Sequence, residues 1–131
     1  MVKDTDTGVQ AEKWIRWLAR GISSLAAGFW LFVGIVAGIS ETEPWTVESV
    51  ILAGLILCSA VGVLIAWFRE GMGGGIVVAC AIAHSTFAYI VSGHNKGFAM
   101  LITGGPLLLS GILFLISWWK SKALSISTND A

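Results

Sequence analysis

The sequence predicts an all-α membrane protein, a four-transmembrane-helix bundle built from two antiparallel hairpins. Two observations lead to this fold class. Of the 131 residues, 56% are hydrophobic and only 12% are charged, whereas soluble domains carry about 25% charged residues. The hydrophobic residues also gather in four runs, each close to the roughly 20 residues that a helix needs to cross a bilayer. A chain of this length is expected to form a single domain, residues 1–131.

The four runs predict transmembrane helices at about residues 15–40, 48–68, 72–92 and 98–119. Their apolar stretches contain no Asp, Glu, Lys or Arg, and the one histidine within them is His84. Backbone N–H and C=O groups need internal partners in lipid, so unbroken runs of Leu, Ile, Val and Ala are expected to be helical. The polar segments 1–8 and 121–131 are expected to be flexible tails.

A short interruption from Arg69 to Met72 separates the second and third runs. A connection this brief predicts a tight antiparallel hairpin whose turn lies at one membrane face, and its glycines let neighbouring helices approach closely. We define the hairpin motif as Trp67, Arg69, Glu70, Gly71, Gly73 and Gly74. Besides a membrane-surface turn, the same segment is compatible with a backbone nest that binds phosphate or another anion at the start of the third helix.

The basic residues predict the orientation of the chain. Lys96 lies on one side of the predicted threading, and the other seven lie on the opposite side: Lys3, Lys13, Arg16, Arg20, Arg69, Lys120 and Lys122. The positive-inside rule therefore predicts a cell-membrane protein with both termini and the hairpin turn in the cytoplasm. Most tryptophans fall at the same interface, as in an aromatic belt: Trp14, Trp17, Trp67, Trp118 and Trp119. The basic segment before the first run is expected to contact lipid headgroups rather than nucleic acid.

Helix packing is expected to depend on small residues, because helices in lipid associate by close van der Waals contact. Small residues recur every four positions on the second and third runs: Gly54, Cys58, Gly62 and Ala66, then Gly71, Gly75, Ala79 and Ala83. In the fourth run, Pro106 follows two glycines and predicts a kink. The kink is expected to be structural, with a gate at this point as the functional alternative.

The polar residues inside the membrane are the candidates for function: His84, Thr103 and Ser110. An ionisable intramembrane residue suggests proton or ion handling, although His84 could instead form a structural hydrogen bond with Thr103. Cys58, Cys80 and His84 are weak candidates for a metal site, and the expectation is that no metal or cofactor is bound, because a free cysteine packs well as a small apolar residue.

Three segments resemble a known family: RWLAR at 16–20, AWFREGMGGG at 66–75, and PLLLSGILFLISWW at 106–119. The chain is similar from about Lys13 to Trp119 to small four-helix integral membrane proteins of unknown function found in archaea and bacteria. This resemblance supports the architecture and implies no activity, catalytic residue or cofactor.

Two functions remain open on these residues. No catalytic constellation is visible, so an enzyme is not expected. The first expectation is a structural, accessory or interaction subunit that packs in a homo-oligomer or a larger membrane complex. The alternative is a small ion, proton or solute transporter or channel component that uses His84 and the polar face of the fourth helix.

Overall fold

The computed structural model describes residues 2–130, with side chains from residue 7 onward. Four helices make up this part of the chain: α1 (Val2–Ser40), α2 (Val47–Phe68), α3 (Glu70–Val91) and α4 (Lys96–Asn129). Each helix contains a stretch that is long and apolar enough to cross a membrane. The prediction of an all-α protein with four candidate membrane spans is therefore confirmed.

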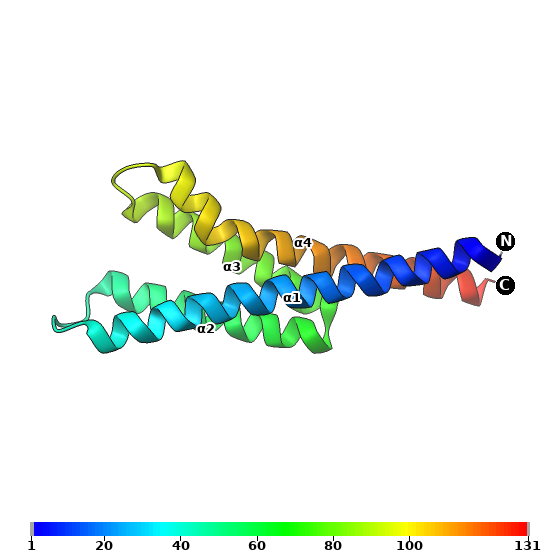
Figure 1. Cartoon of the computed structure of the whole chain (residues 1–131), viewed down its shortest axis with the longest axis horizontal. Helices are drawn as coiled ribbons and strands as arrows, with labels where there is room; N and C mark the ends of the chain where they lie inside the picture. The colour runs from blue at the N-terminus through cyan, green and yellow to red at the C-terminus, as the bar shows by residue number, and fades with distance from the viewer. Residues whose placement is uncertain (1, 131) are drawn as a thin grey trace.

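The helices form a bundle in which α1 packs against α2 and α4, while α3 packs against α2 and most extensively against α4. The α1–α2 and α3–α4 loops lie at one end of the bundle, where the two helix pairs diverge (Figure 1). The α2–α3 turn lies toward the opposite end, and beyond it α1 and α4 continue side by side to the two chain termini (Figure 1). We call the region around the α2–α3 turn, together with the parts of α1 and α4 beside it, the shared end.

Helix lengths explain this shape. At 1.5 Å per residue the 22 residues of α2 and of α3 each extend about 33 Å, close to the thickness of a hydrocarbon core. With 39 and 34 residues, α1 and α4 are much longer and continue past the α2–α3 turn. Their projecting parts are joined by a hydrogen bond of 2.9 Å from Ser121 Oγ to Glu12 Oε1.

The polar ends of the chain are helical as far as the structure describes them. Residues 2–8 are continuous with α1 and residues 121–129 with α4, while residues 1 and 131 lie outside the described part. Residues 121–129 contain neither Gly nor Pro. A helix that is already nucleated gains one backbone hydrogen bond for each residue added, so a polar segment without a breaker extends it.

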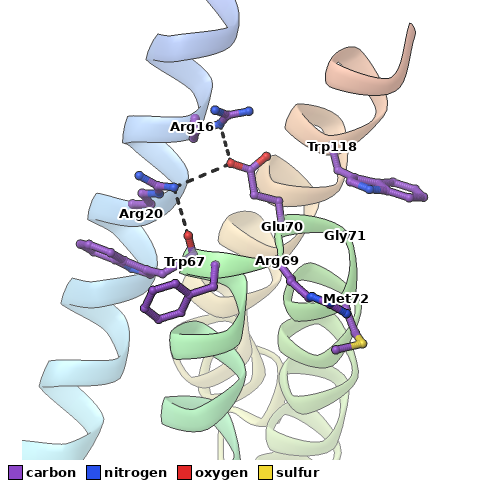
Figure 2. Close-up of a pocket in the computed structure, with 9 residues that line it drawn as sticks. Arg16, Arg20, Trp67, Arg69, Glu70, Gly71, Met72 and Trp118 are labelled. Carbon is purple, nitrogen blue, oxygen red and sulfur yellow. Dashed lines mark hydrogen bonds and ion pairs between the residues drawn. The ribbon is translucent and has the colours of Figure 1, made fainter. Parts of the chain in front are cut away.

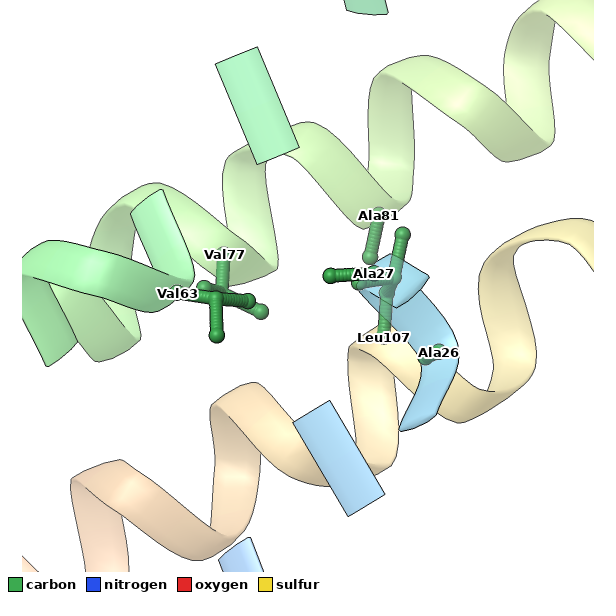
Figure 3. Close-up of a cluster of buried hydrophobic side chains, with 6 residues drawn as sticks. All are labelled: Ala26, Ala27, Val63, Val77, Ala81 and Leu107. Atoms are coloured by element: carbon green, nitrogen blue, oxygen red, sulfur yellow. The ribbon is translucent and has the colours of Figure 1, made fainter. Parts of the chain in front are cut away.

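The interior is built mainly from small side chains. One cluster of buried side chains draws on all four helices (Figure 3): Ala26, Ala27, Val63, Val77, Ala81 and Leu107. A second cluster lies nearer the shared end and contains Ala19, Ala66 and Phe114. Many large apolar side chains are instead exposed on the outside, including Phe32, Leu57 and Ile90. This distribution suits a bundle whose surroundings are lipid and whose helices meet by close packing.

Only some of the small residues predicted to mediate packing do so within the chain. A Cβ atom at Gly62 would lie 2.8 Å from Ile76 Cγ2, and one at Gly71 would lie 2.7 Å from the Trp118 indole. Gly54 and Gly75, in contrast, have no such neighbour within 4 Å. The fourfold spacing in the sequence therefore marks both covered and uncovered glycines.

Pro106 lies inside α4, which remains one helix through this position and bends in the segment drawn from yellow to orange (Figure 1). Proline lacks the N–H that would bond to the preceding turn, and its ring clashes with the carbonyl four residues earlier. The first part of α4 and the neighbouring part of α3 diverge from α1 and α2 (Figure 1).

Candidate functional site

The α2–α3 turn consists of one non-helical residue, Arg69, with φ −134° and ψ 89°. Its N–H donates to Ile65 O at 2.6 Å, and its carbonyl accepts from the Gly73 N–H at 2.9 Å. The backbone hydrogen bonds of α2 therefore continue up to Arg69, and those of α3 begin at Arg69. Glu70 is the first residue of α3, where a carboxylate is favoured by the positive end of the helix dipole.

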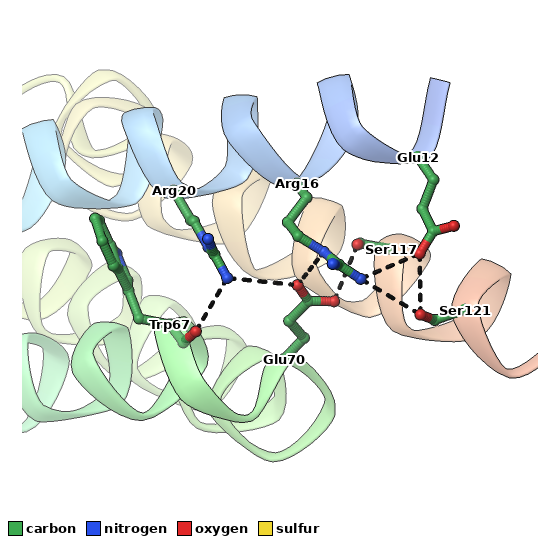
Figure 4. A network of polar contacts seen from close by, with 7 residues as sticks. All are labelled: Glu12, Arg16, Arg20, Trp67, Glu70, Ser117 and Ser121. Carbon is green, nitrogen blue, oxygen red and sulfur yellow. Dashed lines mark hydrogen bonds and ion pairs between the residues drawn. The ribbon is translucent and has the colours of Figure 1, made fainter. Parts of the chain in front are cut away.

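Glu70 joins three helices through its carboxylate (Figure 4). Its Oε1 lies 2.5 Å from Arg16 Nε of α1, and its Oε2 accepts a hydrogen bond of 3.0 Å from Ser117 Oγ of α4. Only 12% of the Glu70 side chain is exposed, so these contacts lie largely out of solvent. The α2–α3 turn is therefore fastened to both long helices.

Further polar contacts extend this arrangement along α1 (Figure 4). Arg16 Nη2 donates to Glu12 Oε1 at 3.1 Å, and Ser121 Oγ donates to the same oxygen. Arg20 Nη2 lies 4.0 Å from Glu70 Oε1 and donates to Trp67 O at 3.1 Å, with its guanidinium 5.4 Å from the Trp67 ring centroid. We call this network the charged joint: Glu12, Arg16, Arg20, Trp67, Glu70, Ser117 and Ser121.

A hollow of about 560 Å³ opens beside the charged joint (Figure 2). We call it the arginine hollow; its lining residues are Arg16, Arg20, Trp67, Phe68, Arg69, Glu70, Gly71, Met72 and Trp118. Arg16 and Arg20 point toward the Glu70 carboxylate, whereas the Arg69 side chain points away from it, toward Met72 (Figure 2). The Nε atoms of Arg16 and Arg20 are buried, and neither makes a hydrogen bond with the described residues; the short approach of Arg16 Nε to Glu70 is an ion pair without hydrogen-bond alignment.

The glycines of the hairpin motif each meet a neighbouring element. Gly71 lies against the Trp118 indole, at 2.7 Å for an added Cβ atom, and the ammonium group of Lys122 lies 4.3 Å from the Trp118 ring centroid. Gly73 packs on the backbone of Ala66, and Gly74 on Phe114. No side chain larger than hydrogen fits at these contacts without displacing a neighbour.

His84 is fully buried in α3, apart from the charged joint. Its Nδ1 lies 3.1 Å from Cys80 O, and because a carbonyl oxygen only accepts, this nitrogen carries the proton. The ring centroid of Trp30 is 6.0 Å away. Nε2 is then an acceptor that has no hydrogen-bond partner among the described residues.

His84 and Thr103, which the sequence allowed as hydrogen-bond partners, are not bonded to each other. Thr103 Oγ1 donates to Ala99 O at 2.6 Å, and Ser110 Oγ donates to Leu107 O at 2.8 Å. Each of the three predicted intramembrane polar residues bonds to a carbonyl of its own helix, as hydroxyl and imidazole groups do when a helical carbonyl is the nearest acceptor.

The weak metal candidates do not form a ligand set. Cys58 is exposed on α2, whereas Cys80 is buried on α3 beside His84. Within the described residues, no group of three His, Cys, Asp or Glu side chains is placed to hold a metal ion. Cys58 and Cys80 lie near each other, as their depth along the two helices suggests, but His84 Nδ1 bonds to the Cys80 carbonyl within α3 and the three side chains do not form a ligand group.

Comparison with protein families assigns most of the chain to a family. The model of a domain of unknown function, DUF7670, matches residues 8–125, which is most of the chain. The chain belongs to the DUF7670 family. No curated protein and no solved structure matches it.

The matched region of this DUF7670 chain contains the whole charged joint. Three segments far apart in the sequence meet there: Arg16 and Arg20 come from RWLAR, Glu70 from AWFREGMGGG, and Ser117 from the end of PLLLSGILFLISWW. Sequence reasoning identified Glu70 only as a marker of the membrane face and missed its partners. The spacing of Arg16 and Arg20 could have indicated a shared partner, since residues four apart lie on one face of a helix.

Proposed function

We propose that this chain is a multi-pass protein of the cell membrane that acts, without catalysing a reaction, as a structural or accessory subunit of a homo- or hetero-oligomer. Both termini and the α2–α3 turn lie on the cytoplasmic side in this proposal. The positive-inside rule supports that orientation, since Arg16, Arg20 and Arg69 gather at the shared end and Lys96 begins α4 at the other.

The observation that carries the subunit role is the set of uncovered glycines on the membrane-spanning helices. Gly28 of α1, Gly54 of α2 and Gly75 of α3 have open space where a Cβ atom would lie. Glycine lowers helix propensity by about 1 kcal/mol relative to alanine, so it is costly where nothing approaches it. In lipid, an uncovered glycine gives a helix of another subunit room for close backbone contact.

Gly54→Leu is expected to weaken association while leaving the subunit folded, because the new side chain occupies open space within one chain and blocks close approach from outside. The particle mass in mild detergent and the chains that co-purify, identified by mass spectrometry, measure this effect. Val50→Leu is the matched control, since Val50 is an exposed apolar residue of the same helix. A wild-type particle with the mass of one chain and no co-purifying protein would contradict the subunit role.

One observation favours transport as a second candidate: the buried Nε2 of His84 has no hydrogen-bond partner among the described residues. A proton or solute route would use this atom together with Thr103 and Ser110. Proteoliposomes containing only this protein distinguish the two candidates. A flux that His84→Ala abolishes would favour transport, whereas flux equal to that of empty liposomes is expected for an accessory subunit.

A further inference from the structure

We propose that the arginine hollow binds the phosphate group of an anionic phospholipid from the leaflet at the shared end. The subunit role neither requires nor implies this site. Three features of the hollow support it independently: surplus guanidinium donors, the start of α3, and an apolar rim at the level where the membrane-spanning part of α2 ends.

The first feature is the excess of positive charge. Among the described residues that line the hollow, Glu70 is the one acidic residue against Arg16, Arg20 and Arg69, and Glu12 pairs with Arg16 from outside the lining. The Glu70 carboxylate already contacts Arg16 and Ser117. Arg20 Nη2 lies 4.0 Å from Glu70 Oε1. Arg69 is exposed and makes no ion pair with any described residue. Guanidinium groups present planar sets of donors that match phosphate oxygens, so the hollow holds more donors than its own carboxylate uses.

The second feature is the N-terminal end of α3. Glu70, Gly71 and Met72 form its first turn and line the hollow, and the Arg69 side chain makes no capping hydrogen bond there. Backbone N–H groups in a first helical turn have no carbonyl partner within the helix, and the helix dipole adds partial positive charge. Both effects favour an anion at this position.

The third feature distinguishes a lipid from a soluble phosphate. Phe68 and Met72 line the same hollow, with 84% and 55% of their surface exposed. They lie where the 22-residue apolar span of α2 gives way to the charged turn, which is the depth of the headgroups. A phospholipid places its phosphate against the arginines and its acyl chains against these two side chains, whereas inorganic phosphate leaves them uncovered.

Lipid retention by the purified full-length protein tests the proposal. The protein is exchanged into nanodiscs of phosphatidylcholine with a minor fraction of phosphatidylglycerol bearing the same acyl chains, released into detergent, and the bound lipids are measured by native mass spectrometry. We expect enrichment of phosphatidylglycerol. Arg69→Gln is expected to reduce it about fivefold, since one basic residue near an anionic surface contributes about 1 kcal/mol. The control is Lys96→Gln, which removes a basic residue at the opposite end and is expected to leave retention unchanged.

A second variant and a soluble probe complete the design. Met72→Glu places a carboxylate at the exposed rim of the hollow and is expected to lower phosphatidylglycerol retention by repulsion, with the folded protein verified by its thermal unfolding. Equal retention of the two lipids, or equal losses in Arg69→Gln and Lys96→Gln, would overturn the site. If inorganic phosphate raised the melting temperature as much as phosphatidylglycerol did, the hollow would be a soluble-anion site and the lipid assignment would be wrong.

Discussion

Gly73→Ala is expected to destabilise the protein by about 3 kcal/mol or more, the upper range for inserting atoms into a tightly packed contact. The added Cβ atom would overlap the backbone N and Cα of Ala66 across the α2–α3 turn. A flexible side chain could move aside, but here the obstacle is the backbone of a buried helix segment. Relief requires α2 and α3 to separate at the turn, which also displaces Glu70 from its partners on α1 and α4.

Gly75→Ala provides the matched control, two residues further along the same helix. A Cβ atom at Gly75 has no neighbour within 4 Å. Gly75→Ala therefore keeps the close contact between α2 and α3 and raises the helix propensity of α3. Thermal or denaturant-induced unfolding in one detergent compares the two variants with the wild type. Similar midpoints for Gly73→Ala and Gly75→Ala would show that α2 and α3 do not meet as closely as described.

Glu70→Gln is expected to cost about 2 kcal/mol of unfolding free energy and to loosen the shared end. Removing one partner of a buried ion pair costs about 3–5 kcal/mol, whereas an exposed pair contributes about 0–1 kcal/mol. The pair is intermediate, since 12% of the Glu70 side chain and 34% of the Arg16 side chain are exposed. The neutral amide has nearly the same size as the carboxylate and can still accept a hydrogen bond from Ser117. The loss of unfolding free energy therefore measures the contribution of the negative charge.

A double-mutant cycle with Arg16→Gln isolates the interaction between the two side chains. Because Arg16 and Glu70 are in direct contact, a coupling free energy of about 1–2 kcal/mol is expected between the single substitutions. Glu43→Gln, in the exposed α1–α2 loop, is the control for loss of a carboxylate elsewhere. Additive effects of Arg16→Gln and Glu70→Gln would rule out the ion pair as a fastening between α1 and the turn.

Only part of the charged joint could be predicted from sequence patterns. The sequence placed Arg16, Arg20 and Glu70 near one membrane face, because each borders an apolar run. Their pairing could not be predicted, since Glu70 follows Arg16 by 54 positions and contact depends on how α1 lies against the turn. The same limit applies to Ser117, which is one of several hydroxyl groups on α4 and bonds to Glu70 because of its position on the helix face.

Two local features of the helices have related physical causes. Their similar depth made a bond between His84 and Thr103 possible, but each side chain bonds to a carbonyl one turn back in its own helix. A hydrogen bond within one helix needs no particular arrangement of neighbouring helices, so it competes well with a bond across helices. Residues 121–129 are likewise helical, since none of them is a Gly or Pro that would stop α4, and the flexibility of the polar ends stays a prediction.

The sequence by itself determined the class of this protein, the number of its helices and the position of the α2–α3 turn. Each of these follows from the cost of placing unpaired backbone groups or charges in lipid, a cost that depends on composition along the chain. The tertiary structure alone decided which glycines are covered and which arginine meets Glu70. These features depend on the rotation and crossing of whole helices, which the packing of many side chains sets together.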